Sequence, residues 1–269
     1  MDLAHGEYIA FLDSDDWLEQ NAIKKLVQFS ILYDADIVAC RSYKEWANAT
    51  EESQMSSLLS VYDGKKACCA LICQGNIGQG VWNKLYRAKL FSIIRFPKGH
   101  VFEDISVTYR LLLSSEKVVW IPDMLIHYRV RISSISHTNT LKNIEDGWRA
   151  IYDLYSALNN EGICYHNALI QTCIKYINII LSTPLSCYNK DDFALLSKKK
   201  ELYHKMKKFV HMHVKEVLTG DFPFKTKCLC VLLLCNRFGY INKRYDMIKK
   251  VKKAFRKGSD MQEKKEMFP

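Results

Sequence analysis

Three carboxylates lie within four residues near the start of the chain, at Asp13, Asp15 and Asp16. They directly follow the apolar run 8–12, whose lack of polar alternation predicts a strand buried on both faces, as in a parallel sheet. Clustered carboxylates repel one another, and a bound divalent cation removes that cost. Hard cations such as Mg²⁺ and Mn²⁺ take oxygen ligands and often share them with substrate phosphates. Because open α/β sheets bind ligands at the carboxyl ends of their strands, this arrangement predicts a metal site.

The same residues also fit the acidic start of a helix. Residues 19–34 follow helical spacing, with Asp13 or Ser14 as the N-cap and the next carboxylates in the first turn, where the helix dipole favours them. The spacing alone leaves both interpretations open. An EF-hand loop is excluded, because the glycine and the distal glutamate of its pattern are absent.

The excess of positive charge is confined to the C-terminal quarter of the chain. Residues 1–195 hold 19 Lys+Arg and 22 Asp+Glu, whereas residues 196–269 hold 20 and 7. This asymmetry indicates a polyanionic partner for the C-terminal quarter alone. The ten cysteines form no C-x-x-C pair, which argues against a zinc site and indicates a reducing cytoplasm.

The basic region ends in a segment, residues 238–269, that predicts an amphipathic helix. An apolar stripe from Ile241 to Phe255 is flanked by lysines and arginines. Such a helix suits an anionic membrane surface, which places the protein in the cytoplasm and peripherally at the inner face of the plasma membrane. The alternative is a solvated charged face that packs its stripe on the protein. Nucleic-acid binding is not expected, because stacking aromatics are not interleaved with the basic residues.

The order of the predicted elements indicates an α/β part followed by a helical part. A second buried strand is predicted at 36–40, an exposed loop at 47–57, helices at 64–73 and 105–113, and two strands at 117–121 and 124–130. Every segment from residue 143 onward has helical spacing. We therefore expect a first domain at 1–140 and a helical region with a basic tail at 141–269.

Four motifs in one order carry a family resemblance. They are the segments 6–18, 82–86 (Trp-Asn-Lys-Leu-Tyr), 102–104 (Phe-Glu-Asp) and 128–136 (Tyr-Arg-Val-Arg-Ile-Ser-Ser-Ile-Ser). Together they resemble family 2 glycosyltransferases with the GT-A fold. The resemblance implies an α/β fold class: a partial GT-A mixed sheet, followed by an α-helical C-terminal region.

The resemblance implies a set of residues for the nucleotide-sugar donor. Asp15 would bind a Mn²⁺ or Mg²⁺ ion that bridges the donor's diphosphate, and Asp13 would hold the ribose or assist the cation. Arg129, Arg131 and Ser134 would close over the diphosphate. A cation and basic groups suit this role, since a departing diphosphate needs its charge stabilised.

The resemblance also implies residues for the acceptor. Asp104 would be the catalytic base of an inverting transfer, with Glu103 beside it orienting the acceptor and Trp82 as a platform for a sugar ring. A carboxylate suits this task because the acceptor hydroxyl must lose its proton as attack develops. Each role has a simpler alternative. The two carboxylates would cap the following helix, Trp82 would be a core residue, and the arginines would be solvated.

The resemblance covers only the second half of the family's catalytic domain. Members carry a βαβ half, with a nucleoside-binding acidic turn, before the strand at 8–12, so we expect a truncated enzyme. The Q-x-x-R-W motif of polymerising members is absent, which favours transfer of a single sugar to a saccharide or lipid-linked acceptor in surface polysaccharide synthesis. The alternative is a non-catalytic remnant or interaction module. A haloacid-dehalogenase-like phosphatase is disfavoured by Trp17, where that family has Thr or Val.

Overall fold

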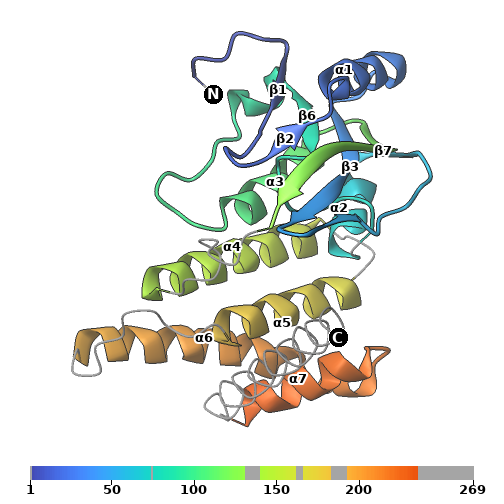
Figure 1. Ribbon diagram of the computed structural model, residues 1–269. Helices are drawn as coiled ribbons and strands as arrows, with labels where there is room; N and C mark the ends of the chain where they lie inside the picture. Colours follow the sequence, from blue (N-terminus) through green and yellow to red (C-terminus); the bar gives the residue numbers. More distant parts are fainter. Residues whose placement is uncertain (1, 74, 131–139, 162–165, 183–192, 236–269) are drawn as a thin grey trace, which may run out of the picture. The chain divides into compact units, whose positions relative to one another are not determined.

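A computed structural model describes residues 2–73, 75–130, 140–161, 166–182 and 193–235 (Figure 1). Its contacts divide the chain into two compact units. The first unit comprises residues 1–137 and 142–173, and the second comprises residues 138–141 and 174–269. The α/β class expected from the sequence is confirmed, because a mixed sheet precedes a series of helices. The contacts group α4 (Leu141–Asn160) with the sheet, whereas the functional boundary near residue 140 stays a prediction.

The first unit is built on one seven-stranded sheet with the order β1-β6-β3-β7-β2, to which β4 adds beside β3 and β5 beside β7. Among the strands that the structure describes, the β3–β7 pair is parallel and the other pairs are antiparallel. The strands are β1 (Tyr8–Ala10), β2 (Trp17–Leu18), β3 (Ile37–Trp46), β4 (Ala49–Glu52), β5 (Ser60–Tyr62), β6 (Lys84–Arg87) and β7 (Val118–Arg129).

Alternate residues of a strand point to opposite faces of the sheet, so apolar side chains on each face need a covering layer. Helices provide it. Helix α1 (Ala22–Tyr33) packs through Ala22 and Leu26 on a cluster that includes Val38, Leu85 and Val119. Helices α2 (Gly64–Ile72) and α3 (Glu103–Leu113) pack on each other. The first unit also contains the 3-10 helix η1 (Ala88–Ser92), and α5 (His166–Ser182) crosses the boundary between the units.

The expectation of a doubly buried parallel strand at residues 8–12 is wrong. Strand β1 is antiparallel to β6 and stands at the end of the described strand order. Tyr8 and Ile9 are therefore half-buried, and Ala10 is exposed. Packing outside the strand explains part of the apolar run. The ring of Phe11 packs edge-on against Tyr86 and two further phenylalanines.

Three other local expectations also need correction. Residues 47–57 are not simply an exposed loop, because β4 forms a hairpin with β3. The two strands expected around Pro122 are one strand, β7, whose pairing with β3 shifts register there; proline lacks the N–H that regular pairing needs. The acidic run does not begin a helix, since β2 intervenes and α1 begins only at Ala22.

The second unit is helical. Its core includes Ile177 from the C-terminal part of α5, Met206 and Val210 from α6, and Leu233 from α7. Helices α6 (Phe193–Thr219) and α7 (Phe224–Leu234) pack against each other. Among the residues described, no helix combines the length and hydropathy needed to cross a bilayer. The predicted basic amphipathic segment, residues 238–269, lies outside the described residues.

Candidate active site

The acidic run forms a tight turn that is tied to the end of β7. The backbone N–H of Asp16 donates to the carbonyl of Asp13 at 3.1 Å. One carboxylate oxygen of Asp16 accepts the backbone N–H of Arg129 at 2.8 Å. Immediately after the turn, Trp17 pairs with His127 across the β2–β7 ladder. Two segments separated by more than a hundred residues therefore meet at this turn.

Asp16 is the buried member of the acidic run. It is 9% exposed, whereas Asp13 is exposed and Asp15 is half-buried. Its second oxygen, Oδ2, is buried without a hydrogen-bond partner among the described residues. Burial raises the pKa of Asp16, and the charges of Asp13 and Asp15 raise it further, against the lowering effect of the Arg129 N–H. The turn thus holds an unsatisfied negative charge that a cation would neutralise.

A stack of three rings supports the turn from the sheet. The imidazole of His127 lies between the rings of Trp17 and Tyr43, with centroids at 4.8 and 4.6 Å. The guanidinium of Arg129 lies over Trp17 at 5.3 Å from its centroid, a cation–π contact. The position of Arg129 beside the acidic turn is therefore set by both its backbone and its side chain.

His127 is held at both ring nitrogens by carboxylates. Its Nδ1 lies 2.7 Å from an oxygen of Glu45 and its Nε2 lies 3.0 Å from an oxygen of Glu19. Burial lowers the pKa of His127, but the hydrogen bonds that its ring donates to these two carboxylates outweigh this effect, so the pKa is raised. The imidazolium form is favoured because both nitrogens then donate.

Trp82 lies flat against a neighbour of Arg129. Its ring stacks on Tyr128 with centroids 5.2 Å apart and an interplanar angle of 12°. The backbone at Gly80 lies close to the indole: a Cβ at this position would fall 2.5 Å from the indole nitrogen. Trp82 also packs on the α1 core cluster. These contacts agree with the core interpretation of Trp82, and its role as a platform for a sugar ring stays a prediction.

Lys84 fixes the loop that carries Trp82. It is 1% exposed, and its Nζ donates to the carbonyl oxygens of Gly78 and Gly80 at 2.9 and 2.5 Å. It also donates to the side-chain oxygen of Asn83 at 2.8 Å. Burial lowers the pKa of Lys84 to about 7, while the charges of Cys40 and Asp104 act in the opposite direction. This lysine joins the Trp82 loop electrostatically to Asp104.

Glu103 and Asp104 form the first turn of α3. Glu103 is exposed and Asp104 is half-buried. One oxygen of Asp104 accepts the N–H of Ile105 at 2.7 Å within the first turn, while the N-cap of α3 is Phe102. Burial raises the pKa of Asp104, and Glu103 adds to the rise, against the N–H of Ile105 and the cation of Lys84. A carboxylate with a raised pKa is a stronger base than an ordinary one.

Residues 82–84 interact with neighbours of the acidic turn and with Asp104. Trp82 stacks on Tyr128, whose pKa is raised by burial and by the charges of the acidic turn. Lys84 acts on the charge of Asp104. Arg131 and Ser134 lie outside the described residues. The donor and base roles of all these residues stay predictions.

Sequence reasoning missed three residues that organise this region. Asp16 was counted only as one carboxylate of a run, and Lys84 only as a letter of its motif. His127 had no role, since nothing around it in the sequence announces its two carboxylate partners. A lysine inside the buried pattern of β6 was the one signal available.

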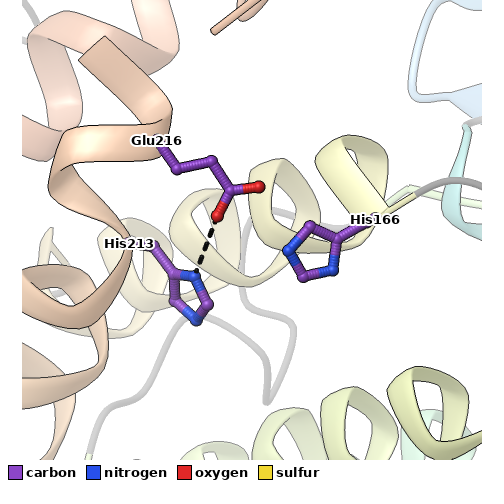
Figure 2. A group of neighbouring side chains, drawn as sticks. All are labelled: His166, His213 and Glu216. Atoms are coloured by element: carbon purple, nitrogen blue, oxygen red, sulfur yellow. Dashed lines mark hydrogen bonds and ion pairs between the residues drawn. The ribbon is translucent and has the colours of Figure 1, made fainter. Parts of the chain in front are cut away.

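Among its described residues, the second unit taken by itself has a histidine–glutamate pair on α6. Nδ1 of His213 lies 3.5 Å from an oxygen of Glu216 one turn further along α6 (Figure 2). His166, also labelled in Figure 2, is on α5 and belongs to the first unit. Two residues offer fewer ligands than the three or four protein ligands usual for zinc, so this pair alone makes no metal site.

Comparison with known proteins identifies the α/β part. Residues 1–98 match the model of the family described as "Glycosyl transferase family 2". The glycosyltransferase GlyA of Streptococcus pneumoniae is 33% identical over 147 residues, and the putative glycosyltransferase EpsH of Bacillus subtilis is 26% identical over 249 residues. The crystal structure of Staphylococcus aureus TarS 1–349 in complex with UDP-GlcNAc superposes with a TM-score of 0.57 at 15% identity.

These matches cover different shares of the proteins compared. The alignment with GlyA takes in 51% of this chain but 21% of GlyA, and that with EpsH takes in 87% of this chain and 69% of EpsH. The TarS superposition covers 91% of this chain and 69% of TarS 1–349. At 15% identity it establishes the fold alone. Residues 1–98 are therefore similar to glycosyl transferase family 2, and the sheet of the first unit has the GT-A fold.

Proposed function

We propose that the protein transfers a single sugar, with inversion, from a nucleotide-diphospho-sugar to a saccharide or lipid-linked acceptor. The observation that carries the proposal is the hydrogen bond between Asp16 and the backbone of Arg129. It brings the Asp-x-Asp turn and the first arginine of the predicted diphosphate-closing segment together. A cation ligand and an arginine at one place suit the release of a diphosphate.

On the donor side, Asp13 and Asp15 would hold Mn²⁺ or Mg²⁺. The acidic turn fits such an ion, because Asp16 keeps a buried oxygen without a partner and feels two neighbouring negative charges. The cation, when bound, would stabilise charge on the departing diphosphate. Arg129 would add a fixed positive charge beside it, and Arg131 and Ser134 are proposed to complete the enclosure.

On the acceptor side, Asp104 would take the proton of the attacking hydroxyl. Its raised pKa makes it a better base, and the charge of Lys84 acts against that rise and so favours the ionised form. Glu103 is exposed next to Asp104 and would orient the acceptor by accepting hydrogen bonds from the acceptor's hydroxyl groups. Trp82 is half-buried, and the exposed part of its indole would contact a sugar ring.

The test is a transfer assay with a panel of nucleotide-sugars, Mn²⁺ and saccharide acceptors, read as release of nucleoside diphosphate. We expect Asp15→Ala to abolish metal-dependent donor binding. We expect Asp104→Asn to leave donor binding unchanged and to lower transfer by roughly 10²–10⁴-fold. Glu51→Ala removes an exposed carboxylate from β4 and is the matched control. Equal transfer by Asp104→Asn and wild type would refute the assignment of the base.

We further propose that the basic C-terminal quarter holds the protein at an anionic membrane surface on the cytoplasmic side. Residues 196–269 hold 20 Lys+Arg against 7 Asp+Glu, and each cation near such a surface contributes ~1 kcal/mol. Co-sedimentation with anionic and neutral vesicles, at low and high salt, tests this. Binding that ignores vesicle charge, or that persists after deletion of residues 238–269, would refute it.

A further inference from the structure

A second carboxylate organises the approach to the proposed base from the side of α4. Asp146 is on this helix and is 6% exposed. Nδ1 of His100 lies 2.9 Å from its Oδ1. The backbone N–H of Val101 donates to its Oδ2 at 3.2 Å. One buried carboxylate therefore binds both the side chain and the backbone of the loop 99–102, which leads directly into Glu103 and Asp104.

A lysine on the same helix closes this arrangement. Nζ of Lys142 donates to Oδ2 of Asp146 at 2.6 Å and also to the carbonyl oxygen of Gly99. The carboxylate is thus paired with a cation, which a buried charge needs. Loop 99–102 is attached to α4 at three consecutive residues: 99 by its carbonyl, 100 by its side chain and 101 by its amide.

The loop needs such attachment because its backbone is unfavourable. Phe102, the N-cap of α3, has φ of +59°, a conformation that L-residues with a side chain rarely adopt. It makes no capping hydrogen bond from its side chain. Strained residues of this kind persist only where the surrounding structure holds them. If the attachment were lost, Phe102 would relax, and the first turn of α3, with Asp104, would turn with it.

We propose that Asp146 is a positioning residue for the Glu103–Asp104 pair, holding loop 99–102 on α4 so that the first turn of α3 presents Asp104 to the acceptor. The positioning role rests on the proposed function, because that function assigns Asp104 as the base. The attachment of loop 99–102 to α4 is independent of the proposed function. The effect on transfer follows from geometry, since a displacement of about 1 Å at a reacting group costs on the order of 10²-fold in rate.

The experiment uses the full chain and two substitutions. Asp146→Asn keeps the shape and removes the charge that pairs with Lys142, and Asp146→Ala removes every contact. Asp153→Asn is the matched control, because Asp153 is on the same helix but is exposed and its charged neighbours are Arg149 and Arg110. Two quantities are measured: amide hydrogen exchange of a peptide covering residues 99–106, and the kcat and donor KM of transfer.

We expect exchange at 99–106 to accelerate by at least roughly tenfold in Asp146→Ala and less in Asp146→Asn, with no change in the control. We expect kcat of Asp146→Asn to fall by roughly 10- to 100-fold while the donor KM changes little, since the donor residues are on other elements. Unchanged exchange in Asp146→Ala overturns the attachment. Altered exchange with unchanged kcat overturns the positioning role. A wild type that transfers no sugar refutes the proposed function, whereas exchange still decides the attachment.

Discussion

Replacement of Asp16 by asparagine should stabilise the protein while weakening its response to a cation. Asp16 has one oxygen bonded to the N–H of Arg129 and one buried oxygen without a partner. Asparagine keeps an acceptor for the N–H and places an amide donor where the unpaired oxygen was. That donor would face the charges of Asp13 and Asp15, which oppose the ionised carboxylate.

The magnitude follows from these two contacts. An unsatisfied buried polar group costs about 1–3 kcal/mol, and a hydrogen bond to a charged group contributes about 1.5–3 kcal/mol. Asp16→Asn removes the cost of the unsatisfied oxygen and keeps a weaker hydrogen bond to the Arg129 N–H, so the free energy of unfolding should rise by ~1–2 kcal/mol. Asp16→Ala removes the same cost but loses the hydrogen bond, so the net change in the free energy of unfolding should be near zero.

The assay is denaturant unfolding at several pH values without divalent cations. The folded-state pKa of Asp16 is raised by burial, so its ionisation costs stability at neutral pH. As the pH falls through this raised pKa, the carboxyl binds a proton in the folded state and the wild type regains that stability. The advantage of Asp16→Asn should therefore be full above the raised pKa of Asp16 and should shrink as the pH falls through it.

Manganese provides the second arm of this experiment. A ligand at a hundred times its Kd stabilises the folded state by ~2.7 kcal/mol. Mn²⁺ should therefore raise the stability of wild type more than that of Asp16→Asn, and the difference between them should narrow or reverse. Asp16→Asn being less stable than wild type at pH 8 without metal would refute the electrostatic reasoning. Equal stabilisation of both by Mn²⁺ would show that Asp16 does not contribute to a cation site.

Three further predictions concern the surroundings of the turn. Lys84→Met should shift the acidic limb of the pH–rate profile to higher pH, because the cation that lowers the pKa of Asp104 is lost; an unchanged limb contradicts this. The raised pKa of His127 makes its stabilising contribution full at low pH and lost as pH rises through that pKa, so His127→Phe should abolish this part of the pH dependence measured by thermal unfolding. Gly80→Ala should cost ~1–3 kcal/mol of stability and weaken acceptor binding, since its Cβ meets an indole at 2.5 Å, whereas Gly78→Ala, the control, meets only a methionine methyl at 3.6 Å.

Local patterns in the sequence were enough to place several elements. The helices at α2 and α3 were predicted within two residues of their bounds, because helical periodicity depends only on neighbours three and four positions apart. The order of four motifs was also sufficient to suggest glycosyl transferase family 2, whose model residues 1–98 match. What the sequence determined is therefore the local elements and the identity of the acidic groups.

The tertiary structure decided which strands pair and which groups meet. Strand β1 is an antiparallel strand at the end of the order, because its pairing with β6, 77 residues further on, leaves no mark in the local pattern. The bond from Asp16 to Arg129 spans 113 residues, and that from Asp146 to Val101 spans 45. Such contacts depend on chain topology and not on spacing. The sequence thus supplied the carboxylates of the proposed site, and only the fold determined which of them is buried, which is bonded and which backbone each one holds.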